Sequence, residues 1–341
     1  MKPIVEFTYD MWKPLDKVRR TILWAFSPWI YPFLRNRELR ICVTACVGII
    51  ASFCITMSFP LWQLLLGPII LGIPHVVGDL RYLMLKDKVY KKEWFWLAVA
   101  LPFFFYFWTN KVFFATFAVV LTAFKTRRKG YERWIVQIIA LTLFALSIQW
   151  PRYFVYAFLH MHNLIGIGIW WFWRKKRKTW ETLPLFLCVL GTMGILYIEP
   201  IYALQYHPPS MNIGYYGRRI AGFASGDTQV SWVLMFAFLQ SIHYLVWIRL
   251  IPEEDRKQKT PRGFEKSYRA LEADFGFWFL FIGFLTLIFF IGYSIYSPRM
   301  ARTNYLALIS FHGFLELVMV AYNKQERTDE LDNSIHANTS N

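Results

Sequence analysis

Long apolar runs separated by short clusters of basic residues are the feature that most constrains this chain. Of its 341 residues, 56% are hydrophobic and 18% are charged, and the charges lie in blocks between the apolar runs. A soluble protein of this length would intersperse its charges. Because the runs reach the roughly 20 residues needed to cross a bilayer, the sequence predicts an all-α, polytopic transmembrane helix bundle.

Ten of these runs are predicted to be spans. The third and fourth are short and are also compatible with a single re-entrant hairpin. The predicted spans are 41–59, 61–82, 94–109, 111–124, 134–150, 152–173, 181–199, 229–250, 275–296 and 305–322.

The flanking segments complete the predicted organisation around a transmembrane helical domain at 41–323. Residues 1–40 contain an apolar piece too short to span, which favours an amphipathic segment on the cytoplasmic face over a poorly formed first span. The outward loop 200–228 is long enough to be a lid or an unstructured connection. The polar tail 324–341 is predicted to be disordered.

The distribution of charge decides both topology and partners. A net charge of +16 would suggest nucleic acid in a soluble protein. Here the basic residues recur in short clusters such as 125–129 and 174–178, which is typical of cytoplasmic loops. We therefore predict both termini in the cytoplasm, a multi-pass location in the cytoplasmic membrane, the lipid bilayer as partner and no nucleic acid. The sequence leaves the oligomeric state open.

Ionisable side chains inside the predicted spans mark a candidate site, because such groups are costly in hydrocarbon and are usually functional. Asp79 lies four residues after His75, and Glu316 lies four after His312, so each pair shares one helical face. Five of the seven histidines lie inside predicted spans, and all five are on even-numbered spans, which all run from outside to inside in the predicted topology. Those histidines are His75, His160, His162, His243 and His312.

Two of these histidines compete for one position on the sixth span. His160 shares a helical stripe with Tyr156 and Asn163, whereas His162 is about 200° away from His160 around the helix. We therefore select His160 as the ligand and hold His162 in reserve.

Imidazole nitrogens combined with carboxylate oxygens are the ligands of non-haem iron sites. The carboxylates could instead orient the imidazoles by accepting their second N–H. No catalytic residue is assigned. The predicted metal ligands are His75, His160, His243, His312, Asp79 and Glu316, with His162, Gln240, Tyr156 and Asn163 in reserve.

The segments Pro74–Asp79 and Phe311–Gly313 resemble the histidine-bearing helices of the Brp/Blh-type integral membrane carotene dioxygenases. The resemblance implies an all-helical fold in which histidines hold iron that cleaves β-carotene to retinal. It favours a non-haem iron oxidoreductase acting on an apolar small molecule, a carotenoid or a lipid.

Two other functions fit the same residues. In a proton-coupled transporter, Asp79, Glu316 and the histidines would relay protons. The other function is electron transfer through b-type haem, with two axial pairs: His75 with His243, and His160 with His312.

Overall fold

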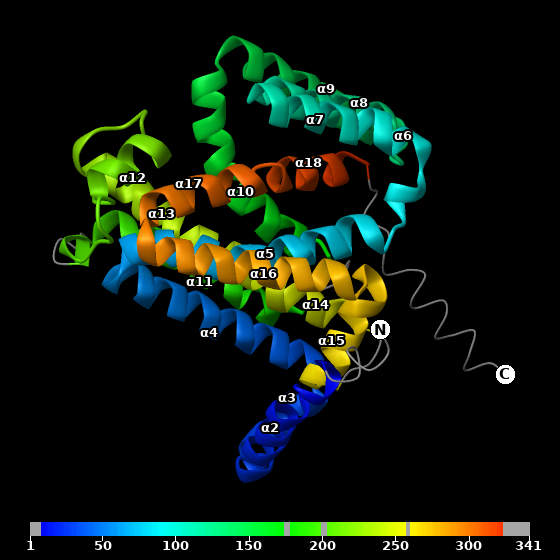
Figure 1. Cartoon of the computed structure of the whole chain (residues 1–341), viewed down its shortest axis with the longest axis vertical. Coiled ribbons are helices and arrows are strands. Elements are labelled where there is room, and N and C mark those ends of the chain that lie inside the picture. Colours follow the sequence, from blue (N-terminus) through cyan, green and yellow to red (C-terminus); the bar gives the residue numbers. More distant parts are fainter. Residues whose placement is uncertain (1–7, 174–177, 199–202, 257–259, 323–341) are drawn as a thin grey trace.

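The computed structural model describes residues 8–173, 178–198, 203–256 and 260–322, and its regular structure there is entirely helical (Figure 1). The all-α prediction is confirmed for these residues, whereas the predicted tail 324–341 lies outside them. The longer helices are α4 (Arg37–Ser58), α5 (Pro60–Asp79), α9 (Gly130–Gln149), α10 (Pro151–Trp171), α11 (Leu183–Tyr197), α13 (Gly226–Leu245) and α16 (Phe277–Tyr296). The shorter helices are α2 (Lys13–Ala25), α3 (Ser27–Arg35), α6 (Glu93–Phe95), α7 (Leu101–Thr109), α8 (Val112–Phe124), α12 (Ile213–Ile220), α14 (Ile251–Glu254), α15 (Phe264–Phe275), α17 (Pro298–Ile309) and α18 (His312–Tyr322).

Several helical stretches are both long enough and apolar enough to cross a membrane, which indicates a membrane protein. The predicted count of ten spans and the location of the termini stay predictions. The seven qualifying stretches among the described residues are Arg37–Ser58, Pro60–Leu85, Gly130–Gln149, Thr179–Tyr197, Gly226–Glu254, Phe277–Tyr296 and Pro298–Tyr322.

The predicted third and fourth spans form a short helical hairpin. α7 and α8 are joined at Asn110, which adopts the left-handed conformation with φ 57°. The two helices pack against each other, and α8 also packs against α9 and α18 (Figure 1). α8 has 13 residues, fewer than the roughly 20 needed to cross a bilayer. This geometry agrees with the hairpin alternative for these two segments.

Wide π-helical turns follow two of the helices that carry predicted site residues. α5 passes into a π-helix at Leu80–Leu85 directly after Asp79, and α13 passes into another at Val246–Leu250. Such segments rotate the following side chains relative to a regular α-helix and are frequent at functional sites.

The N-terminal helices α2 and α3 extend away from the helical body (Figure 1). Neither contains a buried residue, and Trp24 and Trp29 are 82% and 80% exposed. Asp16 ties α2 to α15 because its carboxylate accepts hydrogen bonds from the first two amides of that helix, at 2.8 and 3.1 Å. An exposed apolar face on short helices is consistent with the predicted interfacial segment.

The described part of the loop at 200–228 is folded. It contains α12, whose first turn is capped by the Asn212 side chain accepting from the Tyr215 amide at 3.1 Å. The fully buried Tyr216 donates from its hydroxyl to the carbonyl of Leu61 at 2.9 Å. These contacts fix α12 against the start of α5.

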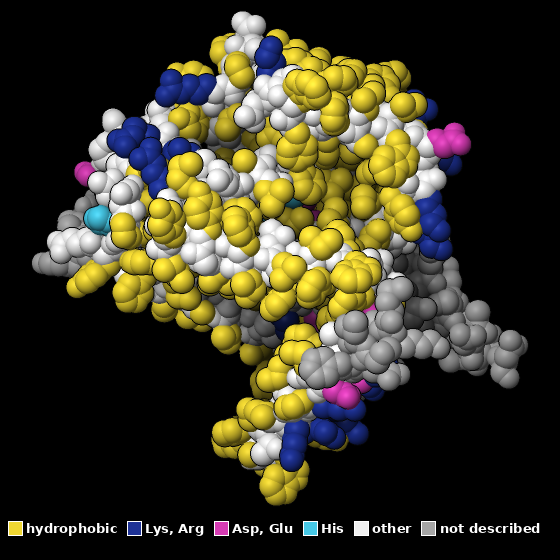
Figure 2. Space-filling model, in the orientation of Figure 1, with side chains coloured by type: hydrophobic (Ala, Val, Ile, Leu, Met, Phe, Trp, Pro, Cys, Tyr) yellow, Lys and Arg dark blue, Asp and Glu magenta, His cyan; other side chains and the backbone are white. Residues whose placement is uncertain are grey.

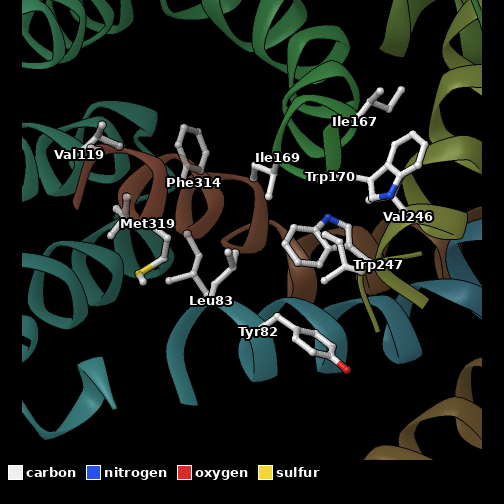
Figure 3. Close-up of a cluster of buried hydrophobic side chains, with 14 of the residues drawn as sticks. Tyr82, Leu83, Val119, Ile167, Ile169, Trp170, Val246, Trp247, Phe314 and Met319 are labelled. Atoms are coloured by element: carbon white, nitrogen blue, oxygen red, sulfur yellow. The ribbon is translucent and has the colours of Figure 1, made fainter. Parts of the chain in front are cut away.

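The core lies where α5, α10, α13 and α18 meet. Figure 3 shows side chains of this core, among them Trp247, Leu83, Phe314 and Met319. The molecular surface is apolar as well: Figure 2 shows hydrophobic side chains over most of the visible face, which is hollowed between the layer of α7–α9 and α17–α18. A surface of this kind is suited to contact with lipid hydrocarbon.

Candidate metal centre

Four imidazoles from four different helices converge inside the core. Each of them offers a ring nitrogen, and these four atoms lie within 4.8 Å of one another. Nε2 of His243 is 3.0 Å from Nε2 of His75, and Nε2 of His312 is 3.0 Å from Nε2 of His162. These four residues, one each from α5, α10, α13 and α18, are called the histidine cluster below.

Backbone carbonyls orient two of these rings. Nδ1 of His75 donates to the carbonyl of Gly72 at 3.1 Å, and Nδ1 of His312 donates to the carbonyl of Ile309. Because a carbonyl can only accept, each Nδ1 carries the proton and each Nε2 presents its lone pair to the centre. The same arrangement fixes ring orientation in known metal sites.

A break in the last helical stretch brings His312 to the centre. α17 ends at Ile309 and α18 begins at His312, so a turn at residues 310–311 interrupts the regular α-helix. The Ile309 carbonyl at the end of α17 is the one that accepts from the His312 ring. His312 is also partly exposed, whereas His75 and His243 are fully buried.

Two carboxylates stand beside the histidine cluster. Oδ2 of Asp79 lies 3.3 Å from Nε2 of His75, and Oε2 of Glu316 lies 3.3 Å from Nδ1 of His162. Oε1 of Glu316 is also 3.5 Å from Nε2 of His243. Asp79 and Glu316 are fully buried; neither oxygen of Asp79 has a hydrogen-bond partner among the described residues, and Glu316 has the indole of Trp247 beside it but no Lys or Arg. Two ionised carboxylates without a cation would be costly there, so the centre favours positive charge.

Glycines provide the space that the rings occupy. A Cβ on Gly166 would lie 2.3 Å from Nδ1 of His243, and a Cβ on Gly313 would lie 2.9 Å from Nδ1 of His162. Both positions lie on helices that themselves carry a histidine of the cluster. The close approach of the helices at this level therefore depends on the absence of side chains there.

The structure corrects the choice between the two histidines of α10. Nε2 of His160 donates to the carbonyl of Ile220 at 3.1 Å, and its ring packs against Trp232 with centroids 4.9 Å apart. His160 thus faces α12 and α13, outside the histidine cluster. His162, the residue held in reserve, occupies the ligand position that was predicted for His160. The helical stripe that contains His160 and Tyr156 faces α12 instead of the cluster. The hydroxyl of Tyr156 accordingly donates to the carbonyl of Arg218 in α12 at 3.0 Å.

The remaining predicted residues divide in the same way. His75, His243, His312, Asp79 and Glu316 are brought together as expected. The side chains of Tyr156, Asn163 and Gln240 make no hydrogen bond to the histidine cluster or its carboxylates among the described residues. No polar neighbour on α10 pointed to His162, and its place in the cluster follows from the packing of α10 against α13 and α18.

Together the histidine cluster and its two carboxylates offer four neutral nitrogens and two anionic oxygens. Ionised carboxylates would give this set a charge of −2, which a divalent cation would neutralise. Comparisons with protein-family models, with curated proteins and with solved structures find no match for the chain. The candidate function is therefore argued from the geometry of the site.

Proposed function

We propose that this protein is a metal-dependent oxidoreductase of the cytoplasmic membrane, with non-haem iron held by the histidine cluster and an apolar substrate. The observation that carries the proposal is the convergence of four imidazole nitrogens beside two fully buried carboxylates that have no Lys or Arg partner among the described residues. Paired charges or a bound metal are the usual reasons for carboxylates at such depth.

The spacing of the ring nitrogens supports metal binding. Two nitrogens bound to one ion at about 2.1 Å, with a right angle between them, lie about 3.0 Å apart. The two Nε2–Nε2 distances in the cluster are 3.0 Å. The lone pairs of His75 and His312 already face the centre because their Nδ1 atoms carry the protons. The rings would therefore need little rearrangement to bind.

The donor set favours iron or manganese over zinc. Structural zinc sites are usually tetrahedral, whereas a mixed set of nitrogen and oxygen donors with more than four members suits an octahedral ion. Iron, when bound, would supply the activation of molecular oxygen. Asp79 and Glu316 would act as ligands or would hold the rings of His75 and His162 in place.

An apolar groove beside α10 supports the proposed substrate class. A cavity of about 610 Å³ lies between α9, α10 and α18, and its lining includes Leu143, Phe158 and Leu317. Phe158 separates the groove from the cluster: its ring centroid is 6.0 Å from that of His162 and 4.2 Å from that of Phe314. A hydrocarbon chain in this groove would lie one side chain away from the metal. A carotenoid or another lipid is therefore the substrate class we propose.

Metal analysis of the full-length protein, purified in mild detergent, tests the proposal. We expect about one iron per chain in the wild type. His75→Ala and His243→Ala should lose most of it, because each removes a ligand from a closed set. Oxygen consumption with a carotenoid or a lipid should fall in parallel. A wild-type protein that neither contains nor takes up a stoichiometric transition metal would overturn the proposal.

Proton-coupled transport is a second candidate, and the buried carboxylates favour it as well. Asp79 and Glu316 could be neutral and exchange protons with neighbouring imidazoles. The double variant Asp79→Asn/Glu316→Gln separates the two functions. For a metal centre, chelator treatment should destabilise the wild type more than this variant, because only the wild type is left with two buried charges. For a transporter, the variant should abolish proton flux in liposomes while chelators have no effect on flux.

The geometry favours a single ion over haem. An iron between two axial nitrogens would hold them about 4 Å apart, with the porphyrin plane between the rings. Nε2 of His75 and Nε2 of His243 are 3.0 Å apart, and His160 is not brought to His312. A Soret band in the purified protein would reverse this preference.

A further inference from the structure

A second large cavity lies between α5 and α16 and opens toward α14 and α15. Its volume is about 830 Å³, larger than the groove beside α10. From α5 into the π-helix that follows it, the lining changes from Ile73 and Val77 to Arg81, one helical turn at a time. The cavity therefore has an apolar end and a basic end.

Contacts between the two helices define the direction of this cavity. A Cβ on Gly283 of α16 would lie 3.9 Å from a methyl carbon of Ile73, at the apolar end. Asp274, at the end of α15, accepts from Arg81 at 2.6 Å, at the basic end. The lining residues of α5 and of the π-helical segment after it extend from Ile73 to Lys86, about 20 Å along a helix. This length corresponds to one leaflet of a bilayer, including its headgroup region.

The basic end carries more positive charge than its acidic residues balance. Glu253 is contacted by three guanidinium groups: Arg40 at 2.9 Å, Arg249 at 3.5 Å, and Arg256. The side chain of Arg256 is 10% exposed, and its Nε has no hydrogen-bond partner among the described residues. Arg262 also lines the cavity. An anion at this end would meet unused guanidinium donors.

The electrostatics of Arg256 agree with this description. Burial lowers the pKa of its guanidinium below the usual value, Glu253 opposes that shift, and the neighbouring Arg249 and Arg40 lower the pKa further. A second anion beside Arg256 would counter both the burial and the repulsion.

We propose that this cavity binds an anionic phospholipid of the bilayer, with its phosphate at Arg256 and Arg262 and an acyl chain between α5 and α16. Guanidinium groups bind phosphate through paired, charge-assisted hydrogen bonds. Basic pockets between membrane helices are suited to anionic headgroups. The proposal is independent of the metal centre and does not rest on the proposed function.

Lipid retention by the full-length protein tests the proposal. The protein is reconstituted in nanodiscs of phosphatidylcholine containing a minor fraction of phosphatidylglycerol, transferred to detergent and washed, and its retained lipid is identified by mass spectrometry. We expect enrichment of phosphatidylglycerol in the wild type. The double variant Arg256→Gln/Arg262→Gln should reduce retention at least about tenfold, because it removes the charged donors.

Two further variants keep the test interpretable. Gly283→Leu should fill the apolar end and also reduce retention, without changing any charge. Arg20→Gln/Arg133→Gln removes two exposed basic residues that do not line the cavity and should leave retention unchanged. Retention of phosphatidylglycerol that neither Arg256→Gln/Arg262→Gln nor Gly283→Leu lowers would overturn the proposal. So would equal retention of phosphatidylcholine, or recovery of a free fatty acid instead of a phospholipid.

Discussion

The two histidines of α10 lie two residues apart and belong to different parts of the molecule. His160 donates to the carbonyl of Ile220 at 3.1 Å and is enclosed by aromatic rings. His162 lies 3.0 Å from another imidazole and 3.3 Å from the Glu316 carboxylate. One side of the helix therefore holds α12 in place, and the other side contributes to the histidine cluster.

This difference shows that burial of an imidazole does not by itself indicate a metal ligand. His160 and His162 are 7% and 9% exposed, so the two are nearly equal in this respect. What separates them is the neighbour of the ring nitrogen, which is a carbonyl for His160 and other ligand-type atoms for His162. A carbonyl makes the facing nitrogen a donor, as it also does for Nδ1 of His75 and His312. Those two rings bring their second nitrogen to the histidine cluster, whereas His160 lies outside it.

The largest difference is expected when each histidine is removed in turn. His162→Ala should lose nearly all bound metal, because it removes one of four ring nitrogens and leaves Glu316 without that neighbour. His160→Ala should keep its metal, although the lost hydrogen bond to α12 should lower stability by about 1 kcal/mol or more. The metal content of each purified variant measures the effect. Equal loss in the two variants would contradict the assignment of the two faces.

Much of the fold is readable from the sequence, because hydrocarbon imposes simple requirements on length and polarity. The helix α16, for example, follows the predicted span 275–296 to within two residues. The break between α17 and α18 was not predicted, since no proline or glycine marks residues 309–311. The predicted boundary between the segments 94–109 and 111–124 coincides with Asn110, whose left-handed conformation was not predicted.

The sequence predicted which residue types form the candidate site better than it predicted which face of each helix points into the site. Five of the six residues selected as ligands lie around one point. His160 was selected because polar neighbours share its stripe, but polar side chains in a membrane bundle also serve to satisfy carbonyls. Which face of α10 meets α13 depends on the position of small residues such as Gly166, and this packing involves residues far apart in the sequence.

A smaller effect is expected from adding one methyl group to α10. Gly166→Ala places a Cβ 2.3 Å from Nδ1 of His243, which is fully buried and cannot move freely. Displacement of that ring should weaken metal binding about 10- to 100-fold, as expected for a disturbed ligand orientation. Gly168→Ala is the matched control, because nothing lies within 4 Å of its Cβ. The control should bind metal normally and be as stable as the wild type or more so.

Titration of the metal-free protein with ferrous iron under anaerobic conditions measures both affinities. If Gly166→Ala and Gly168→Ala bind iron equally, the close approach of α10 to His243 is not needed by the centre. A large loss in both would instead point to a general sensitivity of α10 to substitution.

The smallest effect should come from the opposite face of the helix, where a single neutral hydrogen bond joins Tyr156 to the carbonyl of Arg218 at 3.0 Å. Tyr156→Phe removes only that bond, so the attachment of α12 should weaken by about 1 kcal/mol and the metal content should not change. Hydrogen exchange of the α12 amides measures this, since local opening should become several-fold more frequent. Tyr153→Phe is the control, because Tyr153 is 63% exposed. Faster exchange in α12 with unchanged metal content would show that the attachment of α12 and metal binding are independent. Loss of metal in Tyr156→Phe would show instead that the two faces of α10 are coupled.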